Sequence, residues 1–202
     1  MLPISHIKAQ LCIHEPRRLA LQHGGRQAAV AVILREGTGS YKGTEILFIK
    51  RALKDGDPWS GHMAFPGGHR EPHDSDLIAT ATRETREETG LIIERSDLIG
   101  ELSQEQAGPL DRSLNMIVAP YVFQIRGDPK INLNFEVDET IWTALEPMRE
   151  GRNHAIENRP ATATKTAHKG YRLEGGHFVW GLTYRMMQSF FMALDPDYIR
   201  KD

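Results

Sequence analysis

One apolar run limits the fold of this chain more than any other feature. Residues 27–34 read Gln-Ala-Ala-Val-Ala-Val-Ile-Leu, and no charged side chain interrupts them. The run has the length of a strand rather than of a core helix, and a strand without polar alternation is buried on both faces. Other layers must therefore cover both faces of the sheet that contains it. The run predicts a sheet in the middle of the domain.

The remaining apolar segments predict three further strands and two helices. Those of strand length, rich in β-branched and aromatic residues, are 45–50, 115–123 and 135–142. Those with helical spacing are 74–89 and 180–194. Pro120 lies inside one of the strands, where its missing N–H marks a bulge or a sheet edge. Because strands and helices alternate along the chain, we predict an α/β sandwich with a mixed sheet.

The polar segments between these elements are expected to be irregular. Residues 52–73 and 149–170 are rich in residues that favour turns, and both are interpreted as loops. Asp74 or Ser75 is the expected N-cap of the first long helix. A long loop in a small domain is usually functional or mobile, which applies to the segment 149–170.

Charge and composition exclude several classes of protein. The chain has 25 basic and 27 acidic residues, a net charge of −2, and no long run of like charges, so a basic surface for nucleic acid is not expected. No apolar stretch approaches the roughly 20 residues of a membrane-spanning helix. The single cysteine, Cys12, fits a reducing compartment. We expect a cytoplasmic protein with an N-terminal arm over 1–25 and a single domain over 26–202.

The stretch that carries chemistry is Arg83-Glu-Thr-Arg-Glu-Glu-Thr-Gly-Leu91. On a helix, Glu84, Glu87 and Glu88 fall within an arc of about 100° near the C-terminal end. Their mutual repulsion and the negative end of the helix dipole each cost up to about 1 kcal/mol. A divalent cation would remove this conflict, and ligands that are all oxygen atoms select Mg²⁺ or Mn²⁺ over zinc.

An exposed acidic helix face would show the same spacing without binding a metal. The segment ahead of the helix favours a site, because Phe65-Pro-Gly-Gly68 brings backbone without side chains shortly before the carboxylates. Paired glycines allow a ligand to approach the backbone closely. We therefore expect Gly67 and Gly68 to shape a substrate-binding loop.

This stretch resembles the signature of the Nudix hydrolases, Gly-x5-Glu-x7-Arg-Glu-U-x-Glu-Glu-x-Gly-U, in which U is aliphatic. The matching residues are Arg83, Glu84, Glu87, Glu88, Gly90 and Leu91. Thr85 replaces an aliphatic residue, and Ser75 stands where the first glutamate belongs. Asp74 and Asp76 flank that serine. The glycine, Gly68, comes one residue early, so the loop is one residue longer than the family standard.

Three further segments are similar to the coenzyme A diphosphatase branch of that family: 47–52, 61–68 and 179–183. One departure stands out. Asp55, Gly56 and Asp57 occupy the place where that branch has an arginine thought to help recognise the coenzyme. A carboxylate there would repel a 3′-phosphate by roughly 1 kcal/mol, which is tenfold or less in affinity.

The resemblance implies a Nudix fold and hydrolysis of a diphosphate linkage in a nucleoside diphosphate derivative. It implies that Glu84, Glu87 and Glu88 bind Mg²⁺ or Mn²⁺, and that Arg83 steadies them by ion pairing. These four residues are the expected catalytic set. The strand end also offers Lys50 and Arg51 for binding substrate phosphate, and Glu136 or Glu139 is a candidate general base besides the three glutamates.

The sequence leaves three functions open. The first is a diphosphatase acting on coenzyme A or a CoA-like compound. The second is a pyrophosphohydrolase of a nucleoside triphosphate, a dinucleotide or a nucleotide sugar. The third is a non-catalytic binding module with a Nudix fold, which the intact carboxylates disfavour. In each case the partner is a small nucleotide-type molecule, without nucleic acid or membrane, and a homodimer is left open.

Overall fold

The computed structural model describes residues 2–38, 41–57, 59–107, 115–158 and 167–199. Its helices are α1 (Ile4–Ile13), α2 (Leu77–Thr89), α3 (Leu145–Arg149) and α4 (Gly181–Leu194), with short 3-10 turns η1 (Arg95–Asp97) and η2 (Glu174–Gly176). Its strands are β1 (Arg26–Glu36), β2 (Thr44–Arg51), β3 (Met63–Ala64), β4 (Gly67–His69), β5 (Leu98–Glu101), β6 (Glu105–Gln106), β7 (Met116–Gln124), β8 (Val137–Ala144), β9 (His154–Asn158), β10 (Ala167–Arg172) and β11 (Phe178–Trp180).

The main sheet is mixed and has β1 in its centre, as the apolar run predicts. Its strands follow the order β3-β2-β1-β7-β5, while β4 pairs with β1, β6 with β7 and β8 with β2. Strands β1 and β7 are parallel, and β1 and β2 are antiparallel. A second, smaller sheet has the order β11-β10-β9. The α/β sandwich with a mixed sheet is therefore confirmed.

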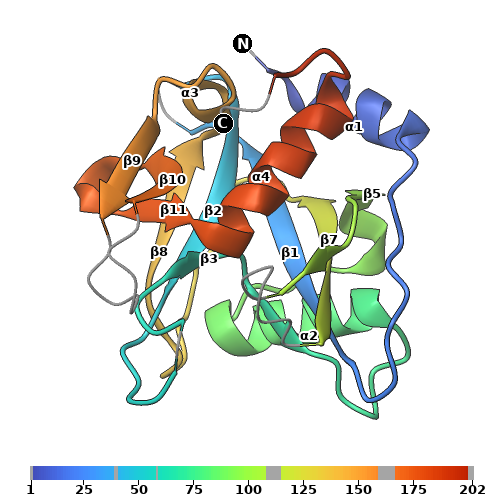
Figure 1. The fold of residues 1–202 in the computed structure, drawn as a ribbon. Coiled ribbons are helices and arrows are strands. Elements are labelled where there is room, and N and C mark those ends of the chain that lie inside the picture. Colours follow the sequence, from blue (N-terminus) through green and yellow to red (C-terminus); the bar gives the residue numbers. More distant parts are fainter. Residues whose placement is uncertain (1, 39–40, 58, 108–114, 159–166, 200–202) are drawn as a thin grey trace.

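Side chains of β1 point alternately into two hydrophobic layers, one on each face of the sheet. Ala29, Ala31 and Ile33 pack in the layer that also contains residues of α2. Val32 and Leu34 pack in the other layer, with residues of α1 and α4. Figure 1 shows α4 crossing one face of the sheet, with α1 next to it. Continuous burial on both faces explains why β1 lacks polar alternation.

Helix α2 begins one or two residues later than the expected cap positions, Asp74 and Ser75, indicate. The N-cap is Asp76, whose carboxylate accepts a hydrogen bond from Ala79 N at 2.8 Å, and neither Asp74 nor Ser75 has this role. Asp74 is instead buried and bound by Arg83, so its carboxylate is not available to the helix end. The helix ends at Gly90, which has a φ of 68° as expected for a left-handed C-cap.

Both expected loops contain short strands, which is the main correction to the sequence interpretation. Within 52–73, β3 pairs with β2 and β4 pairs with β1. Within 149–170, β9 and the start of β10 form part of the small sheet, while 159–166 lie outside the described residues. These strands are short, and most of their exposed side chains are polar. Neither their length nor a pattern of alternating polarity therefore distinguishes them from loops in the sequence.

Pro120 lies on β7 where the neighbouring strand is interrupted. On the β1 side, Pro120 is opposite Val30 in an unbroken parallel pairing. On the other side β5 ends at Glu101 and β6 begins at Glu105, so no strand faces Pro120 there. Leu102 N donates to the Pro120 carbonyl at 3.0 Å. The missing N–H therefore falls at a local sheet edge, as its place in the sequence indicates.

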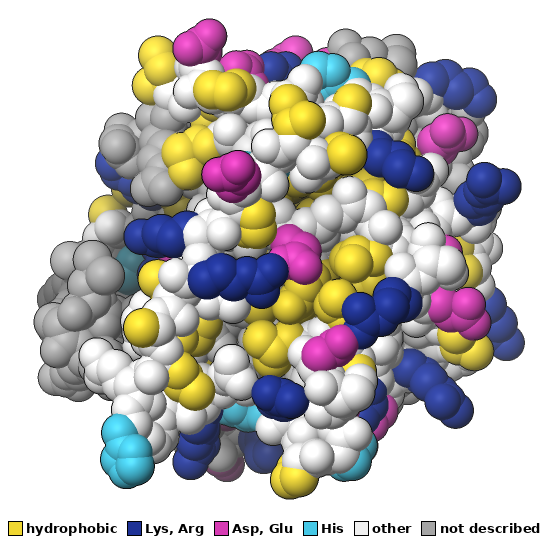
Figure 2. All heavy atoms as spheres, turned by 90° about the vertical axis from the view of Figure 1, so that its right-hand side faces the viewer, with side chains coloured by type: hydrophobic (Ala, Val, Ile, Leu, Met, Phe, Trp, Pro, Cys, Tyr) yellow, Lys and Arg dark blue, Asp and Glu magenta, His cyan; other side chains and the backbone are white. Residues whose placement is uncertain are grey.

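Charged side chains of both signs are interspersed on the surface at the right of Figure 1. In Figure 2, which looks onto that side, Lys and Arg alternate with Asp and Glu around a central group of hydrophobic side chains. The surface in view therefore carries no large region of a single charge sign.

Among the helices in the described part of the chain, none has the length and apolar character needed to span a bilayer.

Candidate active site

Gly67 brings the β4 backbone into direct contact with β1 and with helix α2. Its φ is +152°, which side chains with a Cβ rarely adopt, and a Cβ would lie 2.3 Å from the Ala29 carbonyl oxygen. Gly67 N donates a hydrogen bond of 2.9 Å to Glu88 Oε2. The loop therefore holds one carboxylate of the acidic set through its backbone.

Gly68 leaves room for a second carboxylate. A Cβ at Gly68 would lie 2.5 Å from Glu84 Cδ and Oε1, so only glycine lets the Glu84 side chain lie against the strand. Burial raises the pKa of Glu84, the Arg83 guanidinium opposes that shift, and the charges of Glu87 and Glu136 reinforce it. The paired glycines allow the β4 backbone to approach the acidic helix closely, and their part in binding substrate stays a prediction.

Glu88 is the most deeply buried of the three helix glutamates, with 3% of its surface exposed. Burial raises its pKa to about 8, because a carboxylate loses solvation there. The hydrogen bond from Gly67 N and the charge of Arg51 oppose this shift, whereas the charges of Glu84 and Glu136 add to it. A cation that approached Glu88 would reverse the balance and favour its ionised form.

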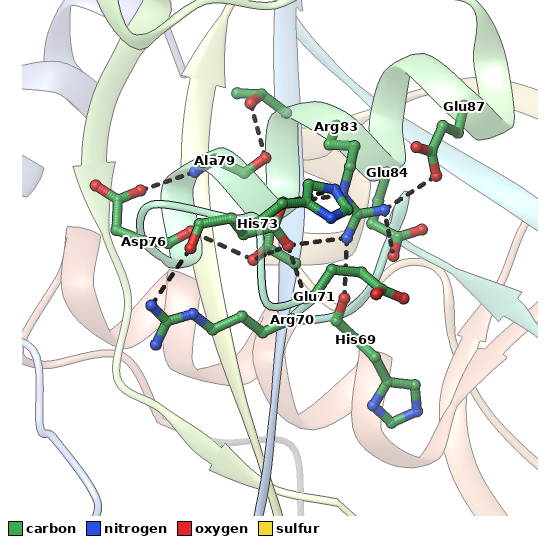
Figure 3. A network of polar contacts seen from close by, with 12 residues as sticks. His69, Arg70, Glu71, His73, Asp76, Ala79, Arg83, Glu84 and Glu87 are labelled. Carbon is green, nitrogen blue, oxygen red and sulfur yellow. Dashed lines mark hydrogen bonds and ion pairs between the residues drawn. The ribbon is translucent and has the colours of Figure 1, made fainter.

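Arg83 links the helix carboxylates to the loop, and Figure 3 shows this network. Its Nη1 atom lies 3.0 Å from both Glu84 Oε1 and Glu87 Oε2. Its Nη2 atom donates to the His69 carbonyl oxygen at 3.0 Å. One planar guanidinium thus fixes two of the three glutamates relative to β4. Arg83 has the ion-pairing role that the resemblance implies.

Asp74, which the sequence offers only as a helix cap, is a buried carboxylate bound by Arg83. It receives two hydrogen bonds from Arg83, from Nε to Oδ1 at 2.9 Å and from Nη2 to Oδ2 at 3.0 Å. Glu71 N and Thr80 Oγ1 each donate to Oδ2 at 2.9 Å. The Arg83 guanidinium holds the pKa of this carboxyl far below its usual range. The signal in the sequence was an aspartate next to the position of the missing glutamate.

A loop between β7 and β8 adds Glu136 to the three helix glutamates. Asn132 N and Asn134 N donate to the carbonyl oxygens of Thr89 and Glu88 at the end of α2, at 2.8 and 3.1 Å. On the other side of the loop, Ala52 N donates to the Glu136 carbonyl at 2.8 Å. The charge of Glu136 raises the pKa of both Glu84 and Glu88, which places its carboxylate in their field.

Glu139 lies elsewhere, with its carboxylate 3.5 Å from His177 Nε2. The two side chains that are predicted to bind phosphate already have acidic partners. Lys50 Nζ lies 2.6 Å from Asp138 Oδ2, and Arg51 Nη2 donates to Asp57 Oδ2 at 2.9 Å. Of the candidates outside the helix, the structure thus brings Glu136 and Arg51 towards Glu88.

The donor chemistry of this set fits a hard divalent cation. Glu84, Glu88 and Glu136 supply carboxylate oxygens, and the charge of Glu136 raises the pKa of both helix glutamates. Oxygen ligands of this kind are those that Mg²⁺ and Mn²⁺ prefer. Within the described residues, no three acidic, histidine or cysteine side chains stand close enough together to hold an ion as they are placed. Glu87 in particular is turned to Arg83 and is exposed. Coordination would require these carboxylates to rotate.

Comparisons with known proteins converge on one family. A family model described as NUDIX domain matches residues 25–164. The mitochondrial coenzyme A diphosphatase NUDT8 of Mus musculus is 32% identical over 146 residues, which cover 68% of this chain and 65% of the relative. The Nudix hydrolase NudL of Yersinia enterocolitica is 31% identical over 131 residues, which cover 61% of each chain. The match therefore spans less than two thirds of the length of these relatives.

Solved structures with the same architecture include a MutT/nudix family protein from Enterococcus faecalis, with a TM-score of 0.55 over 94% of this chain and 67% of that one, at 16% identity. The MutT protein from Methanosarcina mazei has a TM-score of 0.50, covers 87% of this chain and 96% of its own, and is 22% identical. At these identities the likeness establishes the fold and leaves the substrate open.

Proposed function

This chain belongs to the Nudix hydrolase superfamily, and on that premise we propose that it is a metal-dependent diphosphatase acting on coenzyme A or a CoA-like compound. The observation that carries the proposal is the set of buried or half-buried carboxylates, Glu84 and Glu88, held against a glycine loop by Arg83 and by Gly67 N. Substrates of this class carry a diphosphate, whose negative charge must be neutralised before a water molecule can attack.

The glutamates, the arginine and the glycines of the site have different roles in this proposal. Glu84, Glu87 and Glu88 would hold Mg²⁺ or Mn²⁺, which when bound supplies charge neutralisation and acidifies a water molecule. Arg83 orients Glu84 and Glu87 through its Nη1 atom. Gly67 and Gly68 let β4 lie directly against β1 and Glu84, which positions the glycine loop beside the carboxylates.

Glu136 is the better candidate for the general base. It is exposed, so water can reach it, and its charge acts on Glu84 and Glu88. Glu139 interacts with His177 and lies in register with Lys50 on β2, which gives it other partners. A base must lie within hydrogen-bond reach of the attacking water, and a residue facing the metal ligands meets that condition most readily.

Coenzyme A is favoured as the substrate by two lines of support. The relative from Mus musculus is named as a coenzyme A diphosphatase. In addition, Asp57 does not present a free negative charge, because Arg51 Nη2 and Trp59 N both donate to its carboxylate at 2.9 Å. The repulsion expected from this aspartate is therefore reduced. A nucleoside triphosphate, a dinucleotide or a nucleotide sugar remains the alternative, because the branch's arginine is absent there.

The test is a substrate panel with Mg²⁺ or Mn²⁺: coenzyme A, an acyl-coenzyme A, ADP-ribose, a dinucleoside tetraphosphate and a nucleoside triphosphate. We expect coenzyme A to give an adenosine-containing nucleotide and a phosphopantetheine product. Glu84→Gln should lower kcat on the best substrate by about 10³-fold, because a metal ligand supplies several kcal/mol of transition-state stabilisation. The control is Glu101→Gln, whose side chain pairs with Arg18 away from the site.

Metal binding gives a readout that does not depend on activity. Calorimetric titration with Mn²⁺ should show binding to the unaltered protein and much weaker binding to Glu84→Gln/Glu88→Gln. Equal affinity in both proteins would reject the carboxylates as the metal site. Cleavage of another substrate at a higher kcat/KM than coenzyme A would keep the diphosphatase and replace its substrate. The cytoplasmic location and a homodimer stay predictions.

A further inference from the structure

A cavity of about 440 Å³ opens beside the glycine loop, and the proposed mechanism does not use it. It lies where β1 begins and β4 ends, and is lined by Leu21, Gly25, Arg26, Gln27, His69 and Arg70. Two of these side chains are permanently cationic, a third is a histidine, and none is acidic. We propose that this cavity binds a second, uncleaved phosphate group of the substrate. The inference rests on the proposed function, since it assigns a subsite to the same substrate.

The positive charge of Arg70 is held in place without being neutralised. Its described hydrogen bonds go to neutral oxygens, Gln27 Oε1 at 3.2 Å and the carbonyls of Asp74 and Ser75 at 3.4 Å. In Figure 3 its guanidinium and the carboxylate of Glu71 extend in opposite directions. A guanidinium positioned by carbonyl oxygens keeps its full charge and N–H groups for an anion.

The acidic groups near Arg70 are paired with other arginines. The Asp74 carboxylate is bound by Arg83, and the Asp76 carboxylate forms an ion pair with Arg95. Arg26 is exposed, and in the described part of the chain it shares no ion pair with a carboxylate. Among the described residues, the cavity therefore carries uncompensated positive charge in a protein whose net charge is −2.

The spacing along the chain from Gly68 to Arg70 suits two phosphates on one nucleotide. Strand β4 carries Gly68, which lies against Glu84, and His69, which lines the cavity. Arg70 follows, and its backbone N–H donates to the Gln27 carbonyl at 2.9 Å, which fixes it beside β1. Two extended residues span about 7 Å. That is the scale of a ribose with a diphosphate on one side and a phosphomonoester on the other.

This assignment also accounts for the missing arginine in the segment 55–57. In this segment Asp57 forms an ion pair with Arg51. The segment therefore offers no unpaired positive charge to a second phosphate. Arg26 and Arg70 supply two such charges on the other side of the glycine loop. The subsite would thus be built from the ends of β1 and β4 instead of from the loop after β2.

The experiment compares kcat/KM for coenzyme A, which carries a 3′-phosphate, with kcat/KM for 3′-dephospho-coenzyme A. In the unaltered protein we expect a preference for coenzyme A. In Arg26→Gln/Arg70→Gln this preference should fall about tenfold or more, through a higher KM for coenzyme A, because hydrogen bonds to charged groups are lost. Cleavage of the dephospho form should change little. Arg26→Lys/Arg70→Lys should restore part of the preference.

The control variant is Lys8→Gln/Arg126→Gln, which also removes two positive charges from exposed positions. Lys8 lies on α1, and Arg126 follows the end of β7, whereas Arg26 pairs with the start of that strand. It should keep the preference for coenzyme A. An unchanged preference in Arg26→Gln/Arg70→Gln, or an equal loss in the control, would overturn the subsite.

The subsite is separable from the proposed function. If the unaltered protein cleaves neither compound, its substrate assignment fails, and calorimetry then tests the cavity directly. Adenosine 3′,5′-bisphosphate should bind more tightly than adenosine 5′-monophosphate to the unaltered protein, and the two should bind alike to Arg26→Gln/Arg70→Gln. Equal binding of both nucleotides to the unaltered protein would overturn the proposal. Inorganic phosphate binding as tightly as the bisphosphate would also overturn it, because it would identify a site for the free ion.

Discussion

At the scale of single residues, a buried aspartate beside the position of the absent glutamate binds the arginine of the acidic helix. The Asp74 side chain is 3% exposed and receives four hydrogen bonds, two of them from Arg83. Arg83 in turn contacts Glu84 and Glu87. Asp74 therefore belongs to the positioning of the carboxylates, although it contacts none of them in this network.

We predict that Asp74→Asn lowers the free energy of unfolding at pH 7 by about 3 kcal/mol, because it removes the buried carboxylate that accepts from both Nε and Nη2 of Arg83. The folded-state pKa of Asp74 lies below its unfolded value, so the ionised carboxylate stabilises the fold above about pH 4. This contribution is lost as the pH falls towards the folded-state pKa. The difference between the two proteins should therefore shrink on acidification. Urea denaturation at pH 7 and pH 3 measures it.

Asp55→Asn is the matched control, because Asp55 is exposed and an amide there leaves no buried charge unpaired. Its free energy of unfolding should stay within about 0.5 kcal/mol of the unaltered protein. If Asp74→Asn behaved like this control, the ion pair with Arg83 would not hold the loop.

The sequence predicts the site residues that lie on helix α2, but it does not predict those that the fold brings to the site from other segments. Glu84, Glu88 and Arg83 follow from helical spacing and from the family signature. Asp74 was missed because the loop is one residue longer than the standard, so counting back from Arg83 arrives at Ser75. The sequence named Glu136 only among several acidic residues, because its position depends on hydrogen bonds between its loop and α2.

At the scale of elements, the shortest strand pairings position the site. Strand β4 pairs with β1 through Ala28, Ala29 and Val30, and this pairing places Gly67 N on Glu88 and Gly68 against Glu84. A strand of three residues has no recognisable alternation, which is why the sequence predicts a loop over 52–73. The long buried strands were predicted within one or two residues, because their apolar runs are continuous.

We predict that Gly67→Ala destabilises the fold by more than 2 kcal/mol and removes catalytic activity. A Cβ would lie 2.3 Å from the Ala29 carbonyl oxygen and 2.6 Å from Val30 Cα, and backbone atoms cannot move aside cheaply. Gly56→Ala is the control, since Gly56 has a φ of +80° but no heavy atom within 4 Å of an added Cβ. Its cost should be about 1 kcal/mol, from backbone strain alone. Equal costs in thermal denaturation would mean that β4 does not pack closely on β1.

At the scale of the whole molecule, the N-terminal segment shares the core that the sheet builds. Ile4, Ile7 and Leu11 of α1 are buried in the same hydrophobic layer as Phe190 and Phe191 of α4. The sequence predicts an arm over 1–25, because these apolar residues are few and a short helix has little stability by itself. Packing against α4 and β5 supplies the missing stabilisation, and only the tertiary structure shows it.

We predict that Ile7→Ala lowers the free energy of unfolding by about 2–4 kcal/mol and does so for the molecule as one unit. Ile7 is fully buried, so its truncation removes apolar contacts and leaves a cavity between α1 and the sheet. Ile13→Ala is the control on the same helix, because Ile13 is 76% exposed and should change stability little. Circular dichroism and tryptophan fluorescence, followed through urea denaturation, should give one shared midpoint that moves to lower urea in Ile7→Ala. Separate midpoints, or equal stabilities for the two variants, would instead describe α1 as an arm that folds apart from the domain.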